Sequence, residues 1–308
     1  RSKYARYDEK NCIRCSVWDK KMSDSNKLHN IIDNFISNKD ISEGTFFRAI
    51  QNHYDALDST HANKMYSEAF KPENEEKKPA LIRNVFRSGV HSADHANHFL
   101  QAWTDNQDNI RKDFSYVPDS VYETEGVNKN LALNSLKLKP SRIASTALNA
   151  SLPEIKSISE NLKSDPDVIS DMEDSGRNIH NEVASFVNNS MHLRQHSAED
   201  LENHLPFIEA HNHNNSDEII RFLGQQKNTP GHLLTQAIDK HLNDITYTSL
   251  EPALQHKNMP ESYVAKMIQD EHTPEYIKHI ALRSASIPDE IFNNYNSDYI
   301  TIYYFNYK

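Results

Sequence analysis

The sequence predicts an all-α protein in which short helical hairpins stack into an α-solenoid, and three observations favour this class. Prolines recur at intervals of thirteen or fourteen residues, and apolar residues at helical spacing follow them. The chain contains only 6 glycines among its 308 residues, which disfavours the tight turns of β-sheets and glycine-rich nucleotide-binding loops. A phrase also recurs, because ALNASLPE around Pro153 returns one residue longer as ALQHKNMPE around Pro260.

The periodic prolines predict where helices begin. Pro260, Pro274 and Pro288 are spaced by fourteen residues, and an acidic residue follows each of them. Proline is tolerated in the first turn of a helix because the N–H that it lacks would have no partner there. Negative charge in that turn also stabilises the helix. We therefore expect six prolines to lie within the first turn of a helix, namely Pro140, Pro153, Pro230, Pro260, Pro274 and Pro288.

Each recurring unit of thirteen to fourteen residues suits one short helix and a turn. Two such half-repeats form a hairpin of about 27 residues, which buries its apolar stripe only when several copies stack. Over about residues 139–292 the recurring phrase resembles the leucine-rich repeat variant and HEAT-like repeat families. This resemblance implies a curved rod of short helices. It also implies that the protein binds other macromolecules, although a minority of such proteins are DNA glycosylases.

Charge and pattern divide the rest of the chain. Residues 1–22 form a basic arm with seven Lys and Arg residues against three Asp and Glu residues. Residues 23–116 form an N-terminal helical region, whose first helix is expected to be capped near Ser23. Residues 117–138 are interpreted as a linker that leads into the repeats. Residues 293–308 form an aromatic tail, whose β-branched and aromatic residues favour an extended conformation.

The repeat pattern does not explain the apolar and aromatic residues at the two ends of the chain. We expect them to contact a protein partner or a second copy of the chain. The candidates are Tyr4, Tyr7, Arg14 and Trp18 in the arm, and Ile300, Ile302, Tyr303 and Phe305 in the tail. Only the arm offers a surface on which nucleic acid could bind, because the formal net charge of the chain is −10 and a phosphate backbone requires a basic surface; a solvated arm is the alternative.

Two cysteines and a group of histidines are candidates for a zinc site. Cys12 and Cys15 form a C-x-x-C pair, and their flanks show no thioredoxin-like pattern. His91, His95 and His98 stand at i, i+4 and i+7, which would place them on one helix face. Cys12, Cys15, His91 and His95 are the plausible tetrad. Because the chain has 17 histidines, we favour reduced thiols and a solvated histidine stripe, and we predict no metal and no cofactor.

No intact catalytic motif is present, since the sequence contains no P-loop, no G-x-S-x-G elbow and no H-E-x-x-H motif. We predict a non-catalytic protein-binding or structural repeat module in a larger assembly. One alternative is a HEAT-like nucleic-acid-binding protein or DNA glycosylase, for which Trp103, Asp105 and Asp108 would be candidate residues. A second alternative is a zinc-dependent protein that uses the histidine stripe.

The expected compartment follows from composition. Only 2 cysteines occur, too few for a disulfide framework, so we expect a reducing environment in the cytoplasm or in a virion. No apolar run approaches the length of a membrane span. Abundant Asn, Lys, Ile and Tyr with little glycine is typical of AT-rich coding sequences, as in many phages and low-GC bacteria.

Overall fold

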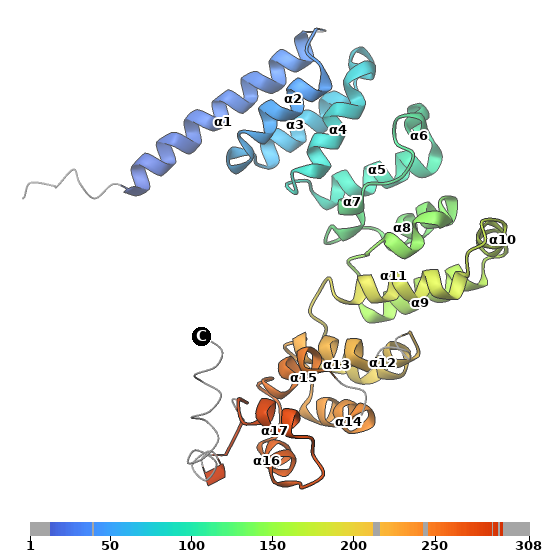
Figure 1. Ribbon diagram of the computed structural model, residues 1–308. Coiled ribbons are helices and arrows are strands. Elements are labelled where there is room, and N and C mark those ends of the chain that lie inside the picture. Colours follow the sequence, from blue (N-terminus) through green and yellow to red (C-terminus); the bar gives the residue numbers. More distant parts are fainter. Residues whose placement is uncertain are drawn as a thin grey trace, which may run out of the picture. The chain divides into compact units, whose positions relative to one another are not determined.

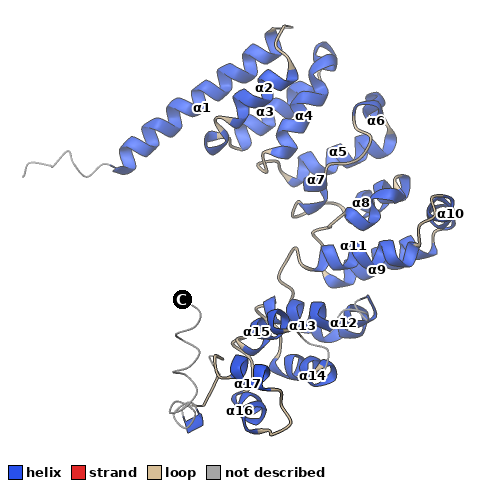
Figure 2. Ribbon diagram, in the orientation of Figure 1, coloured by secondary structure: helices blue, strands red, loops and turns tan. Residues whose placement is uncertain are grey.

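The computed structural model describes residues 13–38, 40–211, 216–242, 246–284, 286–288 and 290–291 (Figure 1). Every regular element in these ranges is a helix, and none of them is a strand (Figure 2). Many short helices pack on one another, which confirms the predicted all-α, solenoid-like class. The chain divides into two compact units, Arg1–Lys139 and Pro140–Lys308. Their boundary lies one residue from the predicted start of the repeats.

The first unit is built from eight α-helices and three short 3-10 helices among its described residues. The α-helices are α1 Ile13–Ser37, α2 Glu43–Gln51, α3 Ser59–Ala69, α4 Lys78–Arg87, α5 Ala93–Asp105, α6 Ile110–Asp113, α7 Asp119–Glu123 and α8 Lys129–Leu138. The 3-10 helices are η2 Tyr54–Ala56, η3 Pro72–Lys77 and η4 Gln107–Asn109. Helix α1 packs on α2 and α3, α3 packs on α4, and α5 packs on α8. Aromatic rings fill much of this core: Phe35 and Phe46 stack with ring centroids 4.0 Å apart, and Phe99 contacts both Phe86 and Phe114 edge-on.

The second unit begins with the 3-10 helix η5, Pro140–Ser145. Its α-helices are α9 Leu152–Ser164, α10 Pro166–Asp174, α11 Ile179–Met191, α12 Ala198–His211, α13 Ser216–Gln225, α14 Gly231–His241, α15 Tyr247–Leu254, α16 Glu261–Gln269 and α17 Glu275–Ala281. Helix α9 packs on α11, α13 packs on α15, and α15 packs on α17. Alternate helices therefore form a row, as expected for stacked hairpins.

The predicted boundary between arm and helical region is wrong. Helix α1 begins at Ile13 and runs without a break through Ser23, so residues 13–22 are helical and Ser23 lies inside the helix and not at its start. This stretch contains no proline or glycine, and its Arg, Lys and Met residues are good helix formers. A run of charged residues was interpreted as an arm, although the same residues extend a helix.

The interpretation of residues 117–138 as a linker is also wrong, because the segment contains helices α7 and α8. Val121 and Leu136 are fully buried, and the hydroxyl groups of Tyr122 and Ser135 form a buried hydrogen bond of 2.9 Å. The residues that suggested a linker instead mark the boundaries of these two helices. Pro118 precedes α7 directly, and Gly126 has a φ of +81° in the turn before α8.

The predicted prolines lie at helix starts, with a one-residue correction for three of them. Pro153 lies in the first turn of α9, and Pro140 is the first residue of η5. Pro230, Pro260 and Pro274 are instead the N-cap residues that directly precede α14, α16 and α17. The backbone carbonyl group of Pro288 accepts a hydrogen bond from the N–H of Ile291 (3.0 Å). An N-cap proline still supplies the first helical carbonyl acceptor, and its missing N–H costs nothing there.

Buried polar side chains join successive turns of the second unit. Gln226, His256 and Ser284 each stand four positions before a proline, and each is buried. Gln226 Nε2 donates to the carbonyl oxygen of Arg194 (3.2 Å), and His256 Nε2 contacts that of Gln226 (2.9 Å). Ser284 Oγ donates to the carbonyl oxygen of Leu254. We call these three residues the polar ladder, because each links its turn to a turn about one hairpin earlier.

Asparagine side chains beside the ladder make a second set of links. Asn228 Nδ2 donates to the carbonyl oxygen of His196 (3.1 Å), and Asn258 Nδ2 donates to that of Thr229 (2.8 Å). The interval is 32 residues in the first bond and 29 in the second. The turns are thus joined by paired polar contacts that satisfy buried backbone groups.

Close backbone contact requires glycine at two positions in the same unit. A Cβ atom on Gly224 in α13 would lie 2.6 Å from the backbone nitrogen of Ala253 in α15. A Cβ atom on Gly231, the first residue of α14, would lie 2.2 Å from the carbonyl oxygen of Asn258. Both distances are shorter than van der Waals contact, so the two glycines permit the tight stacking of successive hairpins.

Candidate functional site

Most of the residues predicted to bind partners lie outside the described residues. This holds for Tyr4 and Tyr7 in the arm and for Ile300, Ile302, Tyr303 and Phe305 in the tail. Arg14 and Trp18 belong to α1, as does Cys15, whereas Cys12 precedes the described part of the chain. The roles assigned to these residues stay predictions.

The three histidines do not form a stripe on one helix face. Helix α5 begins at Ala93, so His91 precedes it. The ring nitrogen Nε2 of His91 lies 2.7 Å from the Thr124 hydroxyl oxygen. His95 stands at the third position of α5, where its Nδ1 accepts from the backbone N–H of Ser92 (3.3 Å) and completes a capping box.

Each of these histidines therefore has a structural partner of its own. His98 Nδ1 forms a 3.0 Å hydrogen bond with the hydroxyl group of Tyr66, which is buried. Burial lowers the pKa of His91, and burial together with the nearby charge of His91 lowers the pKa of His95. Within the described ranges, no three His, Cys, Asp or Glu side chains come together as a possible metal site.

A Ser–His–Asp arrangement occurs between α1 and α3. His61 Nδ1 lies 2.7 Å from the Asp58 carboxylate, and its Nε2 lies 3.4 Å from the Ser25 hydroxyl oxygen. The same Nε2 lies closer, at 3.1 Å, to the backbone carbonyl oxygen of Ser25. A ring that donates to this carbonyl group has no lone pair left to take the hydroxyl proton, which a nucleophilic serine requires.

Burial also argues against a nucleophilic role for this arrangement, since the His61 side chain has no exposed surface. Asp58 is the N-cap of α3 and accepts from the backbone N–H groups of Thr60 and His61. Burial alone would raise the pKa of Asp58, but these hydrogen bonds and the His61 ring lower it below its ordinary value. The arrangement is a polar link that joins α1 to the start of α3.

A charge cluster in the second unit is likewise used internally. The carboxylate of Glu218 in α13 lies 2.7 Å from His192 Nε2, just after α11, and it also accepts from Arg221. Burial alone would raise the pKa of Glu218, whereas the Arg221 hydrogen bond and the two neighbouring cations lower it. The carboxylate is therefore held charged and paired.

Trp103 is not available to stack on a nucleic-acid base. Its side chain is buried, and Nε1 donates to the carbonyl oxygen of Phe114 (3.0 Å). The guanidinium group of Arg111 lies 5.4 Å from the centre of its ring system. Trp103 is thus a core residue of the first unit, which removes the aromatic member of the candidate set for a glycosylase.

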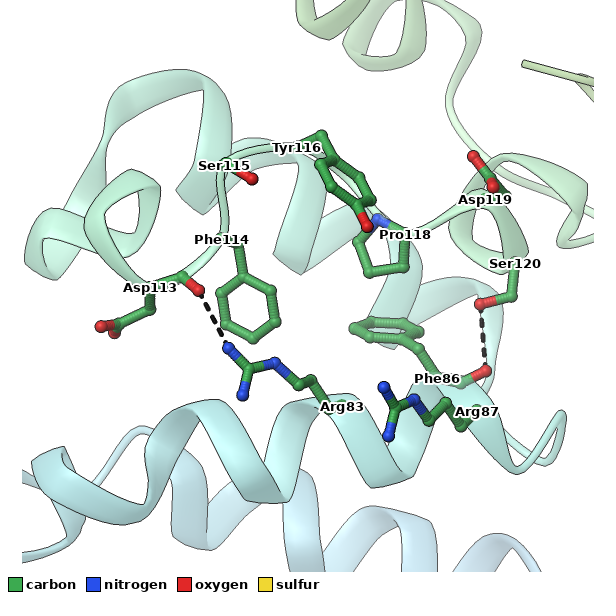
Figure 3. Close-up of a pocket in the computed structure, with 10 residues that line it drawn as sticks. All are labelled: Arg83, Phe86, Arg87, Asp113, Phe114, Ser115, Tyr116, Pro118, Asp119 and Ser120. Carbon is green, nitrogen blue, oxygen red and sulfur yellow. Dashed lines mark hydrogen bonds between the residues drawn. The ribbon is translucent and has the colours of Figure 1, made fainter. Parts of the chain in front are cut away.

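The first unit also contains a pocket of about 440 Å³ beside α4 (Figure 3). Arg83 and Arg87 contribute guanidinium groups from one face of α4, four positions apart. The segment that leads into α7 supplies Phe114, Tyr116 and Pro118 to the facing wall. The pocket therefore combines cationic and aromatic walls, and its lining comes entirely from one compact unit. The complete lining is Arg83, Phe86, Arg87, Asp113, Phe114, Ser115, Tyr116, Pro118, Asp119 and Ser120.

The two arginines of this pocket differ in their partners. Arg83 Nη1 contacts both carboxylate oxygens of Glu43, at 2.7 and 3.0 Å, and its Nη2 donates to the carbonyl oxygen of Asp113 (3.2 Å). Arg87 is exposed and lies 4.9 Å from the centre of the Phe47 ring. Within the described residues, Arg87 forms no ion pair. Arg83 is thus fixed within the fold, whereas Arg87 has donors available.

Sequence reasoning missed this pocket. The signal present in the sequence is the pair Arg83 and Arg87, spaced as i and i+4 within the region of residues 23–116 that was predicted to be helical. The facing wall was missed because Tyr116 borders, and Pro118 lies within, the segment that was interpreted as a linker. The i, i+4 spacing of two arginines is the same on a solvent-exposed helix face and in a pocket wall. The two cases differ only in whether another segment of the chain packs opposite the arginines.

Comparison with known protein families, with curated proteins and with solved structures finds no match to this chain. Among the described helices, none is both long enough and apolar enough to cross a lipid bilayer.

Proposed function

We propose that this chain is a non-catalytic, protein-binding helical repeat module of the HEAT-like kind, which acts inside a larger assembly. The observation that carries the proposal is the Arg87 pocket, where an exposed guanidinium group, which forms no ion pair with any described residue, stands beside an exposed tyrosine. Arginine and tyrosine are enriched among the residues that dominate binding energy at protein interfaces. Tyr116 is 47% exposed, and among the described aromatic side chains only Tyr276 is comparably exposed.

The side chains that could serve in catalysis make hydrogen bonds or ion pairs within the fold instead. The rings of His61, His91 and His98 are bonded to neighbouring helices or turns, and Glu218 is paired with two cations. A binding function requires only an accessible surface with donors and apolar contacts. The pocket beside α4 supplies both, and it is supported by a rigid helical core.

Site-specific photo-crosslinking tests the proposal. A benzophenone amino acid is placed at Tyr116 in the full chain, and a matched control carries it at Asn134, an exposed position on α8 outside the pocket. We expect one protein from an extract of the source cells to crosslink at position 116 and not at position 134. That protein, once purified, should bind the unmodified chain and bind an Arg87→Glu variant at least about tenfold more weakly.

Two results would contradict the proposed function. One is equal crosslinking at positions 116 and 134, which indicates non-specific contact. The other is a purified partner whose affinity is the same for wild type and for Arg87→Glu. Circular dichroism of each variant shows that the helical fold is retained, because both substituted residues are exposed.

A further inference from the structure

From the Arg87 pocket we infer the chemistry of its occupant, which is a carboxylate side chain next to an aromatic side chain in a linear segment of a partner protein. This inference rests on the proposed function and adds the partner chemistry to it. The occupant follows from the contacts that each wall of the pocket can make and from the side chains that already have partners within the fold.

Arg87 supplies the charged contact. The Phe47 ring lies 4.9 Å from its guanidinium carbon, and this cation–π contact holds the planar group in place. This contact with the ring does not use the guanidinium N–H groups as hydrogen-bond donors, so they remain able to donate. A planar fork of donors matches the two oxygens of a carboxylate, so the geometry favours an acidic side chain.

Arg83 explains why only one carboxylate is accommodated. Its guanidinium group already has Glu43 as a counter-ion and the Asp113 carbonyl oxygen as a second acceptor (Figure 3). A second acidic group would have to displace Glu43. Arg83 is therefore a positioning residue that keeps the Asp113 segment and the Phe114 ring close to α4, with the guanidinium carbon 5.4 Å from the centre of that ring.

The remaining walls are apolar and aromatic. Phe86 and Phe114 form the buried base, and Tyr116 and Pro118 form the accessible rim. A volume of about 440 Å³ fits one or two side chains and not a folded element. An aromatic side chain suits this wall, because offset or edge-on contacts with rings add to the burial of apolar surface.

The Asp113 carboxylate does not face Arg87. In Figure 3 the Asp113 carboxylate points away from the two guanidinium groups, and its backbone carbonyl oxygen faces Arg83. The formal charge of −10 on the chain repels acidic partners at long range. At physiological salt this repulsion is screened beyond about 8 Å, so the close contact with Arg87 decides the affinity.

Two short peptides test this chemistry on the full chain. The first probe is N-acetyl-Glu-Phe-Glu-amide, and its charge-reversed match is N-acetyl-Lys-Phe-Lys-amide, with binding followed by ligand-observed NMR. We expect the acidic peptide to bind at least about tenfold more tightly than the basic one. Arg87→Gln should weaken binding of the acidic peptide by about tenfold, which is the loss of one charge-assisted contact. Arg48→Gln, an exposed arginine of α2 outside the lining, should leave binding unchanged.

The results of the peptide and crosslinking experiments distinguish failure of the inferred partner chemistry from failure of the proposed function. Equal binding of the two peptides, or equal binding of the acidic peptide to wild type and Arg87→Gln, overturns the inferred partner chemistry. If the crosslinked protein depends on Arg87 while the acidic peptide does not bind, the proposed function stands and this inference fails. If the acidic peptide binds through Arg87 but no protein crosslinks at Tyr116, the ligand chemistry is correct and the proposed function fails.

Discussion

His196 is the residue whose chemistry is most constrained by its surroundings. Its Nε2 contacts the carbonyl oxygen of Met191 at 2.9 Å, and its Nδ1 is buried without a hydrogen-bond partner. Protonation would place a buried positive charge beside Arg194 and His192, which the Met191 carbonyl oxygen and Asp200 offset only in part. Burial is the main cause that lowers the pKa of His196 below its ordinary value of 6.5, and the two neighbouring cations lower it further.

The lowered pKa of His196 predicts a loss of stability in mild acid. The unfolded chain takes up a proton near the ordinary pKa, while the folded chain resists it. The stability that neutral His196 contributes is therefore fully present above the pKa of the unfolded chain. It falls as the pH drops towards the pKa of the folded chain, by up to about 1.4 kcal/mol per pH unit. Urea unfolding followed by circular dichroism from about pH 7.5 to about pH 5.5 measures this slope.

Substitution isolates the effect of this one histidine. His196→Gln keeps a donor for Met191 and does not titrate, so the stability of the second unit should depend less on pH. His180→Gln, at an exposed position in α11, is the matched control and should keep the wild-type slope. An unchanged slope in His196→Gln would show that other groups cause the acid sensitivity.

Gly224 allows a second prediction at the residue scale. A Cβ atom there would meet the backbone of Pro252 and Ala253 at 2.8 and 2.6 Å, so α13 and α15 must separate. We expect Gly224→Ala to lower the free energy of unfolding by about 1–3 kcal/mol, as overpacking does. Gly44→Ala in α2 is the control, because a Cβ atom there has nothing within 4 Å and alanine favours a helix by up to about 1 kcal/mol. Equal effects of both substitutions would contradict the steric explanation.

The turns between helices carry the polar ladder. Gln226 is the pivotal member, because its Oε1 accepts from the backbone N–H of His196 (2.8 Å) while its Nε2 donates to Arg194. The same residue is the acceptor for His256 through its own carbonyl oxygen. One residue thus connects three successive turns, two through its side chain and the third through its backbone carbonyl oxygen.

Gln226→Ala tests the ladder. The change leaves the buried N–H of His196 without an acceptor, and we expect a loss of at least about 1–3 kcal/mol in the free energy of unfolding. Gln225→Ala changes the neighbouring exposed side chain and should stay within about 0.5 kcal/mol of wild type. Denaturant unfolding of the pair measures the difference, and a loss of similar size in both variants would rule out the ladder as its cause.

Sequence patterns predicted the starts of some helices and missed others. Proline followed by an acidic residue predicted the starts of α9, α16 and α17 to within one position, and proline alone predicted that of α14, because the missing N–H restricts proline to few places in a helix. The start of α1 was missed, since charged residues are equally compatible with a solvated helix and with an arm. Helices α7 and α8 were missed because Pro118 and Gly126 also occur in linkers, and only their packing on α4 and α5 distinguishes the two cases.

At the scale of the whole molecule, the division at Lys139 and Pro140 makes the two units separately observable. The chain has 2 tryptophans, Trp18 and Trp103, and both belong to the first unit. Tryptophan fluorescence therefore reports the first unit alone, whereas circular dichroism reports the helices of both units.

This division predicts different responses to one substitution. Gly224→Ala should lower the unfolding midpoint seen by circular dichroism and leave the midpoint seen by tryptophan fluorescence unchanged. Phe99→Ala is the converse variant, because Phe99 is fully buried in the first unit and its loss should cost about 3–5 kcal/mol there. A shift of both midpoints by Gly224→Ala would show that the two units unfold as one.

The candidate site was less accessible to sequence reasoning than the fold was. Helix periodicity is a local property, so α4 and its arginines were placed correctly. The pocket depends on a non-local contact, namely the return of the Phe114–Ser120 segment to α4, and a single sequence contains no record of that return. The histidines illustrate the opposite error, because a regular spacing suggested one face while His91 lies before the helix.

The polar ladder also bears on how such a chain changes length over evolutionary time. Its links join each turn to a turn about one hairpin earlier, so a segment that extends from one turn to the next contains both the donor and the acceptor side of the link. An in-frame duplication of the codons for residues 227–256 would give the new copy partners on both sides. Recombination between hairpins can therefore add or remove a turn of the stack together with its ladder link.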